Sequence, residues 1–149
     1  MPHCYLLTLC LGSSSDKFTN NYTLFSLIEQ IATSAENLGQ AVPIEVHAHF
    51  VLDEGDKRSP FEMRVIRKAA DGTEDAGPPL PFDTEDLLRY RIRVAGLRLP
   101  AAFGSYTLRL EWRRRGTELW HAESVWWPLV VQELPIGSAA TQPTPLSVS

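Results

Sequence analysis

The chain has 149 residues, of which 44% are apolar and 21% are charged. These proportions are those of a folded globular domain, and a chain of this length can bury about 70% of its unfolded surface around one core. The formal net charge is −4. General nucleic-acid binders have a strong basic excess, so this charge argues against that class of protein. The same charge argues against attachment to an anionic membrane.

The first predicted element is a strand over residues 4–11, whose continuous apolar run indicates a central position in its sheet. No basic residues precede it, so it does not fit a signal peptide. The sequence contains no run of about 20 apolar residues, which is the length that predicts a membrane span. Cys4 and Cys10 would lie roughly 20 Å apart on one strand, too far for a disulfide. We therefore expect two reduced thiols and a cytoplasmic protein.

Residues 22–38 fit two different structures. Leu24, Leu27 and Ile31 follow a helical stripe. The first part of the segment fits a strand followed by a loop equally well. The residues alone favour the helix slightly, and both alternatives stay open.

Four later segments alternate apolar and polar residues, which predicts antiparallel strands with one core face and one solvated face. They cover residues 44–50, 61–68, 88–94 and 106–113. A last strand is expected over residues 124–132, after a short hairpin arm at 118–121. Pro128 predicts a sheet edge for this last strand, because proline lacks the N–H that a central ladder needs.

The predicted fold is mostly β: an antiparallel two-sheet sandwich, immunoglobulin-like or C2-like, with six to eight strands and at most one short helix. Residues 1–134 form a single domain. Residues 135–149 are rich in Pro, Ser and Thr and are expected to be a disordered tail.

Two stretches carry a resemblance to a known family. Leu-Phe-Ser-Leu at 24–27 follows the first strand, and Gly-Ser-Tyr at 104–106 opens a late strand, ahead of Pro-Leu-Val-Val at 128–131. In this pattern the chain resembles a family of short, uncharacterised bacterial β-sandwich proteins over about residues 6–134. The resemblance implies a bacterial origin, a cytoplasmic setting and a strand at 22–28. It implies no activity and no catalytic residues.

One predicted strand carries candidate metal ligands. Glu45, His47 and His49 alternate along residues 44–50, so their side chains project from the same face. Two imidazoles at this spacing can share an ion, but a catalytic zinc needs a third protein ligand and only Glu45 is supplied nearby. The alternative is a pair of ordinary histidines on a solvated face.

Two acidic turns, at 53–56 and 83–86, contain residue types that bind calcium. If the strands over 44–51 and 61–68 are neighbours, these turns lie at opposite ends of the sandwich, roughly 25 Å apart. We therefore expect ordinary solvated charge in both turns.

Three arginines share the outer face of another predicted strand. Arg89, Arg91 and Arg93 could contact a nucleic-acid backbone. No interleaved aromatic residues of the RNA-binding kind accompany them, so nucleic acid is disfavoured as a partner. A solvated face with cross-strand ion pairs is the expected alternative.

Aromatic residues gather near the last predicted strand. Trp126 and Trp127 are neighbours, so on a strand they point to opposite faces. If Trp127 faces the core, Trp126 faces outward beside Pro128, with Trp120 and His121 just before it. An exposed tryptophan is a favoured interface anchor. The alternative is that another segment covers Trp126.

Nucleophile-elbow and phosphate-loop motifs are absent from the sequence. The sequence therefore predicts a non-enzymatic interaction or accessory module that acts through a partner protein or by self-association, with Trp126 at the contact. Two alternatives are a metal-binding protein or metal-dependent enzyme using His47 and His49, and an accessory nucleic-acid contact through the arginine face. No cofactor and no small-molecule ligand is indicated.

Overall fold

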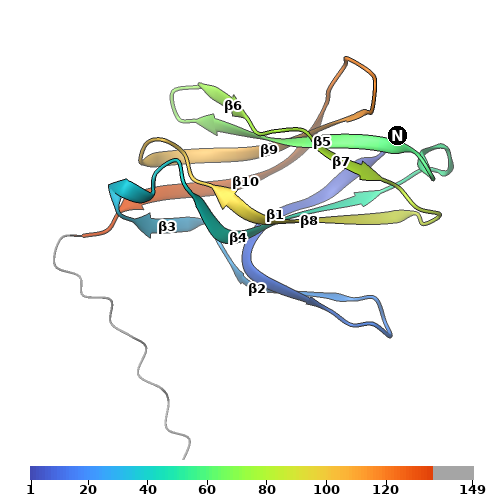
Figure 1. Cartoon of the computed structure of the whole chain (residues 1–149), viewed down its shortest axis with the longest axis horizontal. Helices are drawn as coiled ribbons and strands as arrows, with labels where there is room; N and C mark the ends of the chain where they lie inside the picture. The colour runs from blue at the N-terminus through green and yellow to red at the C-terminus, as the bar shows by residue number, and fades with distance from the viewer. Residues whose placement is uncertain (136–149) are drawn as a thin grey trace, which may run out of the picture.

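The computed structural model describes residues 1–135, which form a sandwich of two β-sheets (Figure 1). The strands are β1 (His3–Ser15), β2 (Tyr22–Leu27), β3 (Gln30–Thr33), β4 (Ala41–Val51), β5 (Pro60–Ala69), β6 (Glu74–Ala76), β7 (Leu80–Asp83), β8 (Arg89–Arg98), β9 (Gly104–Arg114) and β10 (His121–Glu133). Two 3-10 turns, η1 (Ala35–Asn37) and η2 (Glu54–Asp56), interrupt them. The predicted mostly β, two-sheet fold is confirmed. The described residues form more strands than the six to eight predicted, because β3, β6 and β7 are too short to show an alternating pattern.

The two sheets have different sizes and are almost wholly antiparallel. Sheet A has the order β2-β1-β4-β8. Sheet B has the order β3-β10-β9-β5-β6, and β7 also pairs with β5. Only the pairing of β3 with β10 is parallel among the described strands. The first strand, β1, lies between β2 and β4, which confirms its predicted central position.

The core lies between the sheets and takes one face of each long strand. Leu9 and Ala48 of sheet A are fully buried, as is Leu110 of sheet B. On β9 buried and solvated side chains alternate. The buried Leu110 is followed by Glu111, whose carboxylate forms an ion pair with Arg64 at 2.7 Å on the outer face. The period of two in the sequence therefore records which face of each strand meets the opposite sheet.

Residues 22–38 form two strands and a 3-10 turn instead of an α-helix, and the first of these strands, β2, covers most of the strand expected at 22–28. β2 belongs to sheet A, whereas β3 pairs with β10 in sheet B. Of the expected helical stripe, Ile31 packs against the core from β3, whereas Leu27 is exposed, so the stripe does not share one face.

The predicted edge position of the last strand is wrong. β10 has β9 on one side and β3 on the other, so β3 forms this edge of sheet B. Pro128 is tolerated because the pairing with β3 begins only at Val130. Its missing N–H therefore interrupts no bond of that ladder. Residues 115–120 form the loop before β10 and contain no separate strand.

The two acidic turns lie close together, contrary to the expectation from sequence. The ammonium of Lys57 is 2.9 Å from the carboxylate of Glu54 and 3.6 Å from that of Asp86. The expectation failed because β4 pairs with β8 and not with β5. The end of β4 and the start of β8 therefore meet at the same end of the sandwich.

Three other expectations concern the chain as a whole. Cys4 and Cys10 are both buried free thiols, as predicted. Apart from Pro135, the predicted tail at 135–149 lies outside the described residues. Within residues 1–135, no helix has the length and apolar character needed to cross a membrane.

Candidate functional site

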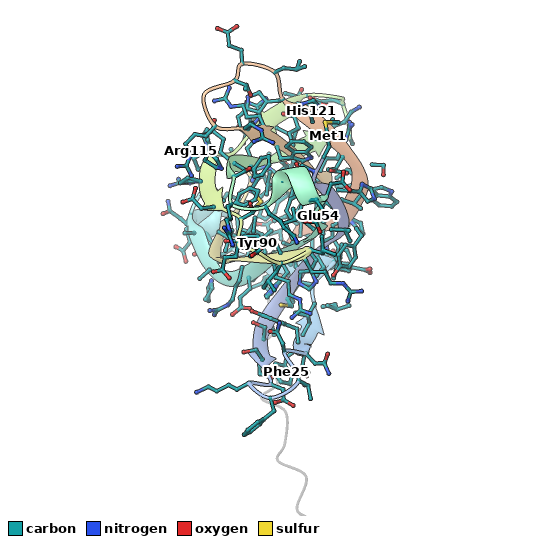
Figure 2. All side chains as sticks on the ribbon, turned by 90° about the vertical axis from the view of Figure 1, so that its right-hand side faces the viewer. Met1, Phe25, Glu54, Tyr90, Arg115 and His121 are labelled. Atoms are coloured by element: carbon teal, nitrogen blue, oxygen red, sulfur yellow. The ribbon has the colours of Figure 1, made fainter. Side chains whose placement is uncertain are left out.

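A two-stranded ribbon leaves the sandwich at sheet A. Cys10 is the last residue of β1 that pairs with β4, and beyond it β1 pairs only with β2. We call residues 11–27 the arm. In Figure 1 the arm lies below sheet A. Figure 2 shows the arm projecting from the sandwich, with Phe25 labelled on it.

The arm is fastened to the outer face of sheet A by Tyr22. The Tyr22 ring meets the rings of His47 and His49 edge-on, with centroids 6.3 and 6.0 Å away. The guanidinium of Arg91 lies 4.7 Å above the Tyr22 ring and donates a 2.6 Å hydrogen bond to the carbonyl of Asn20. This contact brings the tip of the arm over the outer face of sheet A.

Because the arm covers the face that carries the two histidines, these side chains are buried and not solvated. His47 is 1% exposed and His49 is 6% exposed, so neither is the solvated surface histidine that the alternation indicated. Tyr5 also packs on this face, with its ring centroid 5.9 Å from that of His49. The outer face of sheet A therefore holds a buried polar cluster.

Glu45 is the centre of this cluster, and its two oxygens have separate partners. Oε1 accepts a hydrogen bond from Arg93. Oε2 accepts one from the hydroxyl of Ser13 at 2.8 Å, lies 2.8 Å from Nε2 of His47, and is 3.9 Å from the thiol of Cys10. Strand pairing explains the convergence, because Cys10 stands opposite Glu45 and Arg93 stands opposite His47.

The electrostatics of the cluster follow from these contacts. The hydrogen bonds from Arg93 and then His47 lower the pKa of Glu45 to about 2, so the carboxylate is charged at neutral pH. Burial, and then the charge of Glu45, raise the pKa of the Cys10 thiol. Burial, followed by the nearby Arg91 charge, lowers the pKa of His49 to about 4.

Two imidazole nitrogens in the cluster lack partners. Within the described residues, Nδ1 of His47 and Nε2 of His49 are buried and make no hydrogen bond. The two rings are neighbours, with centroids 6.2 Å apart. Unpaired buried polar atoms are rare in native proteins and cost about 1–3 kcal/mol each.

The structure brings together part of the predicted metal set and adds a residue that was missed. Glu45 and His47 touch, whereas His49 makes no hydrogen bond with either. Cys10 completes a group of three whose ligand atoms all lie within 4.8 Å of one another. Sequence reasoning missed Cys10 because it is 35 residues from Glu45, and only the register of β1 on β4 joins them.

The arginine face of β8 is largely occupied by other parts of the chain. Arg93 pairs with Glu45, and Arg91 holds the arm. Arg89 is exposed. The three side chains therefore do not present a continuous free basic face.

The predicted aromatic patch is divided. Trp126 is 60% exposed, while the indole N–H of Trp127 donates a 2.6 Å hydrogen bond to the carbonyl of Ile28. The ring of Trp120 is contacted by the guanidinium groups of Arg64 and Arg113, at 4.2 and 4.3 Å.

The other two residues of the predicted patch have different surroundings. His121 stacks on the buried Trp112, with ring centroids 4.6 Å apart. Pro128 is half-buried within β10. Trp126 stands on the outer face of sheet B opposite Arg109, and Pro128, opposite Thr107, follows it on the same face.

Exposed apolar side chains gather instead on the arm. Within residues 1–135, thirteen large apolar side chains are exposed, and five of them lie among the seventeen residues of the arm: Leu11, Phe18, Tyr22, Phe25 and Leu27. Phe18, at the tip, is fully exposed. This density exceeds that of the rest of the described surface, and such patches mark interaction sites in soluble proteins.

No protein-family model and no curated protein matches the chain. Among solved structures, the chain is similar to a family 123 glycoside hydrolase from Clostridium perfringens, whose structure was analysed for glycolipid glycan hydrolysis. The TM-score is 0.37 and the identity is 11%, over 87% of this chain and 28% of the hydrolase. The chain thus spans less than a third of that protein's length, and a likeness of this degree supports no shared activity.

Proposed function

We propose that the protein is a non-enzymatic interaction module that self-associates through the arm, with β2 of one copy pairing with β2 of a second copy. The observation that carries this proposal is the position of β2, an uncharged and apolar strand, at the edge of sheet A.

The edge of β2 lacks the usual protection against pairing. β2 reads Tyr-Thr-Leu-Phe-Ser-Leu, with no charged residue and no proline. Natural proteins usually guard an exposed edge with lysine, proline, a bulge or a covering segment, because unpaired N–H and C=O groups invite another strand. The side chains of Phe25 and Leu27 are 50% and 56% exposed, so an incoming strand would also cover apolar surface.

A second copy of the chain fits this edge. Two identical strands related by a twofold axis pair antiparallel, and each supplies the same surface to the other. An uncharged strand meets its copy with no like-charge repulsion. We expect the pairing to run over residues 22–25, because Ser26 has a φ of 52° and departs from extended geometry. The two four-stranded A sheets would then be continuous.

The contact predicted from sequence, at Trp126, has less support than the arm. On the outer face of sheet B, Trp126 stands opposite Arg109, and the hollow beside it is lined by polar residues that include Thr107 and Ser124. A single exposed tryptophan in polar surroundings offers a small apolar area. Trp126 therefore serves as the control position.

The test is the mass of the protein in solution, measured by light scattering over a range of concentrations. We expect the wild-type chain to pass from 16.7 kDa to twice that mass as concentration rises. Phe25→Lys places a charge on the edge and is expected to keep the chain monomeric at every concentration. Trp126→Lys introduces the same charge on another exposed aromatic residue and is expected to dimerise normally.

Two outcomes would overturn the proposal. One is a wild-type chain that stays monomeric throughout the range. The other is a dimer that survives Phe25→Lys and is lost in Trp126→Lys, which would move the contact to sheet B.

A cytoplasmic setting and a bacterial origin belong to the same proposal. The two free thiols support a reducing compartment, where disulfides are rare. The origin rests on the family resemblance alone.

A further inference from the structure

We propose that Cys10, Glu45 and His47 form a binding site for a divalent transition-metal ion of the zinc class, at the root of the arm. The site is independent of self-association, because its ligands are buried behind the arm and do not belong to the β2 edge.

The spacing of the three side chains is close to that of a metal site. All three candidate ligand atoms lie within 4.8 Å of one another. Oε2 of Glu45 is 2.8 Å from Nε2 of His47 and 3.9 Å from Sγ of Cys10. Zinc bonds of about 2.0–2.3 Å in a tetrahedral site place neighbouring ligand atoms roughly 3.3–3.7 Å apart. Side-chain adjustments of about 1 Å would therefore seat an ion between them.

The kinds of ligand select the kind of ion. A thiol, an imidazole and a carboxylate suit zinc, cobalt or a similar borderline ion, whereas calcium and magnesium require six or more oxygen ligands. Three protein ligands also leave a fourth tetrahedral position for water.

Glu45 is already oriented for this role. Arg93 holds Oε1, so Oε2 alone is turned toward Cys10 and His47. Carboxylate ligands in metal sites are commonly fixed in this way by a hydrogen bond to their other oxygen. The hydroxyl of Ser13, 2.8 Å from Oε2, adds a further polar group from the arm itself.

The environment of His47 is a second observation. His47 is 99% buried, and among the described residues its ring makes no hydrogen bond except the one between Nε2 and Oε2 of Glu45. A cation in place of the proton between Nε2 and Oε2 would turn that single bond into two metal–ligand bonds. Burial keeps water from competing for these ligand atoms.

The test uses cobalt(II) as a spectroscopic probe of the full chain after treatment with a chelator. We expect one equivalent of cobalt to produce a thiolate-to-metal charge-transfer band together with the visible bands of a tetrahedral site. The band should disappear in Cys10→Ser. His47→Gln should weaken binding by at least about tenfold.

The chain supplies matched controls. Cys4 is a second buried thiol and His121 a second histidine, and neither belongs to the group. Cys4→Ser and His121→Gln should keep the band. The proposal is overturned if the wild-type chain gives no charge-transfer band, or if Cys10→Ser gives the same band as wild type. If Cys10→Ser does not fold, His47→Gln decides the question, since a cobalt affinity equal to that of the wild-type chain in this variant also overturns the site.

Discussion

At the scale of single residues, Glu45 is a buried carboxylate whose charge needs partners. Removing a carboxylate from water costs several kcal/mol unless partners replace the lost solvation. Here Arg93 supplies the opposite charge, while Ser13 and His47 supply polar contacts from two further positions. One acidic residue thereby joins β1, β4 and β8 on the outer face of sheet A.

Cys4 allows a prediction about reactivity. Burial raises the pKa of its thiol to about 11, about two units above the ordinary value of 9.0. At pH 8 the folded protein therefore holds roughly a hundredfold less Cys4 thiolate than the unfolded chain. We expect iodoacetamide to label Cys4 at least that much more slowly in the folded state, as measured by mass spectrometry of its peptide. Equal rates with and without denaturant would contradict the burial of this thiol.

The raised pKa of Cys4 also makes the stability of the folded protein depend on pH. The folded state resists deprotonation of Cys4, so its contribution to stability is fully present below pH 9. As pH rises from about 9 to about 11, the unfolded chain loses the proton first and this contribution falls.

At the scale of elements, the arm depends on a few side-chain contacts, of which Arg91 makes two. We predict that Arg91→Ala loosens the arm and speeds tryptic cleavage after Lys17 several-fold, because protease access follows local opening. The matched control is Arg89→Ala, two residues away on the same strand and exposed. The measurement is the initial rate at which the fragment ending at Lys17 appears. A rate unchanged by Arg91→Ala would show that other contacts hold the arm.

The elements also show what a sequence can and cannot predict. Alternation located β4, β5, β8 and β9, because each has one face in the core and period two records that directly. Alternation does not assign strands to sheets. It therefore gave no sign that β4 pairs with β8 and not with β5.

The candidate site depended on contacts distant in sequence. Glu45 and His47 were found from their spacing on one strand, but Cys10 reaches them only through the register of β1 on β4. Both histidines are covered in part by the ring of Tyr22, which reaches them from the arm. Local periodicity in the sequence gives no information about the position of Cys10 or of Tyr22 relative to β4.

At the scale of the whole molecule, charge balance opposes nucleic-acid binding. The net charge is −4, and three of the four arginines on β8 are engaged within the chain. We predict that labelled duplex DNA is not retained even at low salt, as measured by fluorescence anisotropy. Salt-sensitive binding that Arg89→Ala weakens would contradict this prediction and restore the arginine face as a contact.

The tryptophans have an uneven distribution over the molecule. Trp112 lies on β9, Trp126 and Trp127 lie on β10, and Trp120 lies in the loop between these strands. The chain contains four tryptophans in all, so none belongs to sheet A or to the arm. Intrinsic tryptophan emission is therefore an optical reporter of sheet B alone. Unfolding followed by this emission and by backbone circular dichroism gives coincident transitions only if the two sheets separate and melt as one cooperative unit.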